Sequence, residues 1–74
     1  MKIELIPENP QKDLLIVRIE IVRIFKNDEE YYDDDSASFN FSYNQDDPES
    51  YDMMINQISE KYNIPEDFIS VNFD

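Results

Sequence analysis

The stretch that decides the fold is LLIVRIEIVRIF, residues 14–25. Six of its twelve residues are isoleucine or valine, whose branched side chains pack well on a pleated strand and crowd the turns of a helix. Regular alternation along this strand predicts a core face made of Leu15, Val17, Ile19, Ile21 and Phe25. The same alternation predicts an opposite face that carries Ile16, Arg18, Glu20, Val22 and Ile24.

Shorter apolar segments on either side predict two partner strands. Ile3 and Leu5 alternate with polar neighbours in a strand that ends at Pro7, and its shortness predicts an edge position. Residues 36–43 (SASFNFSY) place an apolar side chain at every second position, which predicts a half-buried strand. A three-residue turn at 27–29 gives an antiparallel register with Val17 opposite Phe39, Ile19 opposite Ala37, Phe25 opposite Tyr31, and Arg23 opposite Asp33.

The following segment, residues 47–61, predicts a helix. Asp47 suits the N-cap, Pro48 the first helical position, and Glu49 the positive end of the helix dipole. Met53 lies off the predicted apolar stripe, so we expect it to be exposed. The stripe itself follows at spacings of three and four and consists of Tyr51, Met54, Ile55, Ile58 and Tyr62.

The end of the chain predicts one more strand and completes the fold class. Asn63 can adopt the left-handed conformation that closes a helix, and Pro65 prevents the helix from continuing. Ile69, Val71 and Phe73 then alternate as a last strand. The order β-β-β-α-β predicts an α+β fold, with a small antiparallel sheet of three or four strands and one helix on its apolar face. With 74 residues we expect a single domain, residues 1–74.

The charge is large and unevenly distributed. The formal net charge is −12 at pH 7. Residues 1–26 contain four acids and five bases, whereas residues 27–74 contain fourteen acids and a single base, Lys61. Such a charge destabilises a compact fold by self-repulsion, so it calls for a role in solubility or in partner binding. The same negative field repels phosphate, and we therefore expect no direct binding of nucleic acid.

The residue types restrict the possible chemistry. The chain has no histidine and no cysteine, which excludes thiolate zinc sites and histidine acid–base catalysis. A catalytic pair of carboxylates needs a walled cleft that so short a chain can scarcely build. The run 33–35 (DDD) lacks the glycine and the twelfth-position glutamate of an EF-hand loop. We expect no enzyme, no metal site and no cofactor. The sequence has neither a signal-peptide pattern nor a membrane-spanning run, which predicts a cytoplasmic protein.

The acids gather in two groups, one at the predicted hairpin and one at the predicted helix start. Carboxylates about 5–7 Å apart on a strand or a helix are compatible with partial imitation of duplex DNA, which carries one phosphate per about 3.4 Å of helix axis along each strand. We expect Tyr32 to be the exposed aromatic of the hairpin, and no acid from Asp28 to Asp35 to be needed by the core. The predicted partner-binding residues are Asp28, Glu29, Glu30, Tyr32, Asp33, Asp34, Asp35, Asp46, Asp47, Glu49 and Asp52.

In size, charge and composition the chain resembles the small acidic DNA-mimic inhibitors that phages and mobile elements use against CRISPR effectors, restriction enzymes, nucleases and repair enzymes. The resemblance implies an inhibitor, for example an anti-CRISPR or anti-restriction protein, that occupies the basic nucleic-acid-binding groove of a host protein as a monomer or homodimer. The alternative is a structural or adaptor protein whose acidity serves solubility. In that case the strand face of Ile16, Val22 and Ile24 would mediate oligomerisation or partner binding.

Overall fold

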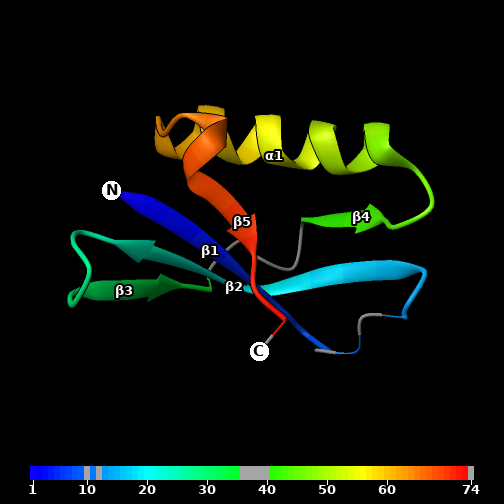
Figure 1. The fold of residues 1–74 in the computed structure, drawn as a ribbon, viewed down its shortest axis with the longest axis horizontal. Helices are drawn as coiled ribbons and strands as arrows, with labels where there is room; N and C mark the ends of the chain where they lie inside the picture. The colour runs from blue at the N-terminus through cyan, green and yellow to red at the C-terminus, as the bar shows by residue number, and fades with distance from the viewer. Residues whose placement is uncertain (10, 12, 36–40, 74) are drawn as a thin grey trace.

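The computed structural model describes residues 1–9, 11, 13–35 and 41–73. In these residues a five-stranded sheet forms one layer and a single α-helix lies across one of its faces (Figure 1). The α+β class is therefore confirmed. The elements in chain order are β1 (Lys2–Pro7), β2 (Ile16–Phe25), β3 (Tyr31–Asp34), β4 (Ser42–Asn44), α1 (Pro48–Tyr62), the short 3-10 helix η2 (Glu66–Phe68) and β5 (Ile69–Val71).

The strand order differs from the prediction in two respects. The order is β3-β2-β1-β5, with β4 also paired to β2, so β1 lies inside the sheet and its predicted edge position is wrong. The sheet is mixed, because β5 runs parallel to β1 while β2 runs antiparallel to β1, β3 and β4. A parallel neighbour requires a long crossover connection, and α1 provides part of it. The all-antiparallel expectation is therefore wrong for the last strand.

A β-bulge interrupts the alternation of β2. Ile6 pairs with Ile21 and Pro7 pairs with Ile19, so Glu20 is an extra residue on β2. The chain repeats IVRI at 16–19 and 21–24, and this odd spacing of five residues would place the two copies on opposite faces of a regular strand. The bulge returns both copies to the same face. As a result four residues of β2 are at most 3% exposed: Val17, Ile19, Val22 and Ile24.

The predicted core face of β2 is accordingly right before the bulge and wrong after it. Val17 and Ile19 are buried as predicted, whereas Ile21 and Phe25 are only half-buried on the face away from α1. Leu15 precedes the strand and is exposed. The apolar face suggested for oligomerisation is wrong too, because two of its three members are buried in the core: Val22 and Ile24 are buried, and Ile16 is exposed.

The β2–β3 hairpin forms in the predicted register. Phe25 lies opposite Tyr31 and Arg23 opposite Asp33. The backbone N–H of Lys26 donates to the carbonyl of Glu30 at 2.8 Å, which closes the predicted three-residue turn. The side chain of Asn27 accepts hydrogen bonds from the backbone N–H groups of Glu29 and Glu30, at 2.8 and 3.0 Å. This side-chain turn stabilises the loop without a glycine.

The strand β4 pairs antiparallel with β2 as predicted, but in another register. Val17 lies opposite Tyr43, four residues beyond the predicted partner Phe39. Phe41 and Tyr43 are buried, in agreement with the predicted alternation. The remaining predictions for this strand, the positions of Phe39 and Ala37, fall outside the described residues.

The register changes because the pairing with β2, expected to run without interruption from Tyr31 to Tyr43, is made by two separate strands. β3 ends at Asp34, opposite Val22, and β4 begins at Ser42, opposite Arg18. Residues 35–41 therefore lie between the two strands, where β2 has only residues 19–21. In a regular antiparallel pair the two strands would have the same number of residues between these two points. The continuous pairing expected from the alternation is therefore wrong.

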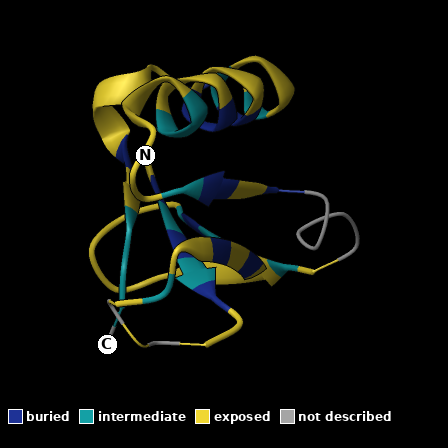
Figure 2. Ribbon diagram, turned by 90° about the vertical axis from the view of Figure 1, so that its right-hand side faces the viewer, coloured by how far each residue is buried: buried dark blue, intermediate teal, exposed yellow. Residues whose placement is uncertain are grey.

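The helix α1 begins, packs and ends as predicted. The Asp47 side chain accepts a hydrogen bond from the backbone N–H of Glu49 at 3.1 Å, and Asn63 closes the helix with φ 55° and ψ 48°. The predicted stripe faces the sheet, and the opposite side, including Met53, is exposed (Figure 2). Tyr43 of β4 meets Tyr51 edge-on with ring centroids 5.1 Å apart. No helix in the described parts of the chain has the length and apolar character needed to cross a membrane.

The bulge predicts unequal effects for two isoleucines three residues apart. We expect Ile24→Ala to lower the free energy of unfolding by about 2–5 kcal/mol, because it opens a cavity in the core. We expect Ile21→Ala to have a clearly smaller effect, because its side chain is only half-buried. Chemical denaturation of both variants tests this. A larger loss for Ile21→Ala would mean that β2 alternates without a bulge.

Candidate acidic binding surface

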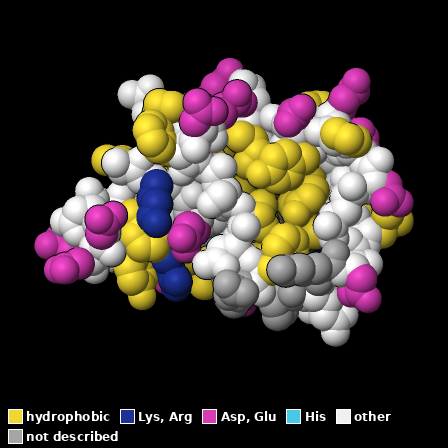
Figure 3. Space-filling view, in the orientation of Figure 1, with side chains coloured by type: hydrophobic (Ala, Val, Ile, Leu, Met, Phe, Trp, Pro, Cys, Tyr) yellow, Lys and Arg dark blue, Asp and Glu magenta, His cyan; other side chains and the backbone are white. Residues whose placement is uncertain are grey.

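The structure places the two predicted acidic groups far apart. The turn between β2 and β3 lies at the left end of the long axis in Figure 1, and the connection from β4 into α1 lies at the right end. The molecule measures 32 × 22 × 20 Å along its principal axes. Acidic side chains are visible at both ends and along the edge formed by α1 (Figure 3). The predicted residues therefore form a discontinuous surface along the molecule and not one compact cluster.

Three of the predicted binding carboxylates take part in the fold. Asp33 accepts two hydrogen bonds from the guanidinium of Arg23, at 2.8 and 3.0 Å. Asp34 accepts a hydrogen bond from the Tyr62 hydroxyl at 2.8 Å, which ties β3 to the end of α1. The third residue is the N-cap Asp47. Among the described residues the core contains no acid, as expected, but Asp33 and Asp34 support the fold through hydrogen bonds outside the core.

These contacts shift the pKa values of the groups involved. The hydrogen bonds from Arg23 hold the pKa of Asp33 below its usual range, because they favour the ionised carboxylate. Burial raises the pKa of Tyr62, and its hydrogen bond to Asp34 raises it further. The shift of Asp33 indicates that this carboxylate is a charged acceptor within the fold. Its negative charge is at least partly engaged by the contact with Arg23.

A second set of carboxylates has no such role. Among the residues that the structure describes, six predicted binding residues have exposed side chains without a hydrogen bond or an ion pair. We call them the outward carboxylates: Asp28, Glu29, Glu30, Asp46, Glu49 and Asp52. Glu49 also lies in the first turn of α1, where a negative charge stabilises the helix. Asp35 is exposed but has a contact within the fold, so we do not count it.

The two tyrosines of the hairpin are both accessible. Tyr32 is 51% exposed, which confirms the prediction, but Tyr31 is 52% exposed as well. Both faces of β3 are therefore accessible at this point, and β3 is the last strand on its side of the sheet. Tyr31 packs on Phe25 with ring centroids 5.3 Å apart, and the Arg23 guanidinium lies 4.4 Å from its ring.

Three basic side chains lie close to an acid or an aromatic ring, namely Lys2, Arg23 and Lys61. Lys2 lies 3.7 Å from a Glu4 carboxylate oxygen and 4.7 Å from the centre of the Phe25 ring. Lys61, the one base in residues 27–74, lies 5.9 Å from the centre of the Phe41 ring. Within the described residues these bases contact aromatic rings and acids of the fold. None of these contacts is with an outward carboxylate, so those six charges face solvent.

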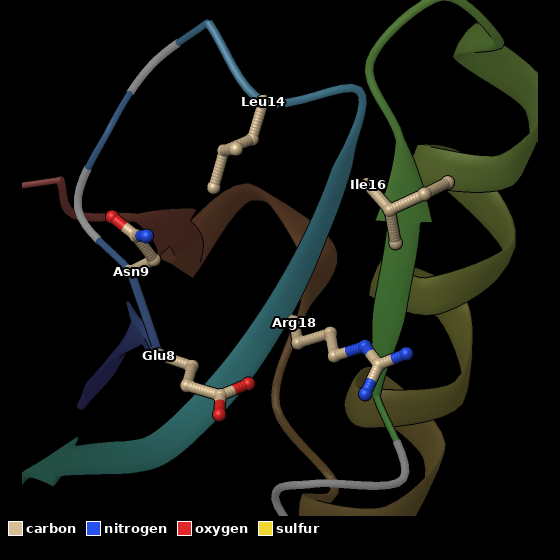
Figure 4. Close-up of a pocket in the computed structure, with 5 residues that line it drawn as sticks. All are labelled: Glu8, Asn9, Leu14, Ile16 and Arg18. Atoms are coloured by element: carbon tan, nitrogen blue, oxygen red, sulfur yellow. The ribbon is translucent and has the colours of Figure 1, made fainter.

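The described residues line an open groove beside β2. This groove has a volume of about 500 Å³, and its described lining residues are Glu8, Asn9, Leu14, Ile16 and Arg18. Leu14 points into it, and Ile16 and Arg18 extend from β2 across β4 (Figure 4). Among the described residues that line it, the charged side chains are those of Glu8 and Arg18. Within the described residues no three acids are close enough to hold a metal ion.

The lowered pKa of Asp33 predicts a pH-dependent effect on stability. A carboxylate whose pKa is lower in the folded state stabilises the fold above its unfolded pKa of about 3.9, and this contribution is lost as the pH falls through its folded pKa. We expect Asp33→Asn to melt below the parent at pH 7. The difference should shrink as the pH falls below about 4.

Thermal melts across this pH range, with Asp28→Asn as a matched control, make the comparison. The Asp28 side chain has no partner in the described fold, so its replacement should leave the melting temperature at pH 7 unchanged or higher. A deficit for Asp33→Asn that stayed constant down to pH 2 would show that the Arg23 pair contributes nothing through its charge.

Comparison with known proteins gives no guide to the role of this surface. The chain matches no protein-family model, no curated protein and no solved structure. Its function must therefore be argued from the chemistry of its own side chains.

Proposed function

We propose that this protein is a small acidic inhibitor that binds the basic nucleic-acid-binding surface of a host protein, in the cytoplasm, as a DNA mimic. It acts by binding and not by catalysis. The observation that carries the proposal is the set of six outward carboxylates, which face solvent although the net charge is −12. Carboxylates without an internal partner add repulsion to the folded state, so a role outside the fold accounts for them best.

The kind of partner follows from charge and dimensions. An acidic surface associates with a surface rich in lysine and arginine, and complementary fields speed the encounter. The outward carboxylates lie at both ends of a molecule whose long axis is 32 Å. That length corresponds to about nine phosphate steps of one DNA strand. A groove shaped to hold a duplex could therefore contact both ends of the molecule at once.

The adaptor hypothesis loses the surface on which it depended. Val22 and Ile24 belong to the core, and Ile16 alone of that trio is exposed. Ile16 and the neighbouring Leu15 are exposed, but two exposed apolar side chains are ordinary on a protein surface and are not the strand face of that hypothesis. The acidic surface remains as the better candidate for partner binding.

The proposal is tested first by capture and competition. The immobilised protein should retain DNA- or RNA-binding proteins from a bacterial extract, and duplex DNA should release them. Binding should weaken steeply with added salt, because ions screen the contacts that replace phosphate contacts. Retention that neither DNA nor salt reverses would contradict the proposal.

Charge removal at the hairpin turn then tests the residues. We expect the triple variant Asp28→Asn, Glu29→Gln, Glu30→Gln to keep its fold and to bind the captured protein at least about tenfold more weakly. Isothermal titration with the purified partner measures the change. A matched control removes three exposed charges elsewhere: Glu8→Gln, Asp13→Asn and Glu60→Gln. Equal losses of affinity in both triple variants would mean that net charge alone determines binding. Unchanged affinity in the hairpin triple variant would contradict the assignment of these three residues to the binding surface.

A further inference from the structure

One end of the sheet carries a row of aromatic rings beside the acidic turn. Tyr31 begins β3, and Phe25 ends β2 directly opposite it. Lys2 begins β1 opposite Phe25, and Phe68 immediately precedes β5, which lies on the other side of β1. The strand order β3-β2-β1-β5 therefore places these residues in sequence across the same end of the sheet.

Between two of these rings lies a groove. It has a volume of about 210 Å³ and is lined by Met1, Lys2, Phe25, Asn27, Asp28 and Phe68. This is below the roughly 300–1,000 Å³ of sites that enclose drug-sized ligands, and it suits a single long side chain. Phe68 is 54% exposed although its side chain is entirely apolar. The groove thus offers an open aromatic wall next to an outward carboxylate.

The charges beside the groove are of both signs, and the three acids of the turn outnumber Lys2 and the α-amino group of Met1. Asp28 lines the groove, and Glu29 and Glu30 follow it in the same turn without hydrogen-bond or ion-pair partners for their side chains in the described structure. The positive charge of Lys2 is offset by Glu4 at 3.7 Å. The fold itself already places cations on rings at this end of the sheet, namely Lys2 on Phe25 at 4.7 Å and Arg23 on Tyr31 at 4.4 Å.

We propose that this groove receives an arginine side chain of the basic partner, with its guanidinium against Phe68 and its charge beside Asp28. The inference rests on the proposed function and assigns the anchor of the complex to the hairpin end of the molecule. Arginine is the better occupant because its planar guanidinium stacks on aromatic rings and is more weakly hydrated than the lysine ammonium. Interface hot spots are also enriched in arginine and in aromatic residues.

The test uses nona-arginine and nona-lysine peptides as probes of the full chain. We expect Phe68→Ala to weaken nona-arginine binding about two- to fivefold, the range of an exposed cation–π contact. Phe68→Leu keeps an apolar side chain without the aromatic ring and should weaken nona-arginine binding by a similar factor. Nona-lysine binding should change less in both variants. Amide NMR shifts on titration with nona-arginine should be largest around Asn27, Asp28 and Phe68.

A control separates this inference from the proposed function. Met53 is 64% exposed on α1, away from the groove, and Met53→Ala should bind nona-arginine as the parent does. Unchanged nona-arginine binding in Phe68→Ala and Phe68→Leu would overturn the proposal that the groove binds arginine. An equal loss in Met53→Ala would overturn it too. If the hairpin triple variant still lost binding in that case, the proposed function would stand without the groove. If neither the ring nor the charges mattered, both proposals would fail.

Discussion

The bulge at Glu20 determines which side chains of β2 face the core. The strand β2 pairs with β1, β3 and β4, so its side-chain directions set the faces of most of the sheet. The extra residue lets both IVRI segments direct their valines and second isoleucines toward α1. It also leaves Arg23 on the far face, where the guanidinium holds Asp33 of the neighbouring strand. A single inserted residue thereby serves both the core and the main ion pair of the hairpin.

The described acids of this protein fall into two groups, those with hydrogen bonds inside the fold and those without. Asp33, Asp34 and Asp47 each accept a hydrogen bond that joins two parts of the chain or caps the helix. The outward carboxylates have no such contact within the described residues and lie at the two ends of the molecule. The first kind stabilises the fold by local charge and hydrogen bonding, whereas the second adds repulsion. Binding of a basic partner would relieve that repulsion.

Local patterns predicted the local structure well and the long-range arrangement poorly. The cap at Asp47, the stripe of α1 and the turn after Phe25 follow from neighbouring residues and are confirmed. The parallel pairing of β5 and the inner place of β1 depend on contacts between distant segments, which no local pattern encodes. The bulge did have a signal, namely the five-residue spacing of the IVRI repeat. The contact between Asp34 and Tyr62 required both the hairpin register and the position of the helix end.

We infer that the outward carboxylates other than Glu49 oppose folding and so serve a purpose outside it. Thermal melts in a series of NaCl concentrations test this most directly, with the parent and a variant that neutralises Asp28, Glu29, Glu30, Asp46 and Asp52. Glu49 is left in place because it stabilises the helix dipole. We predict that the variant has a higher melting temperature than the parent at low salt. Added NaCl should raise the melting temperature of the parent more than that of the variant. A variant that melts below the parent at every salt concentration would contradict it.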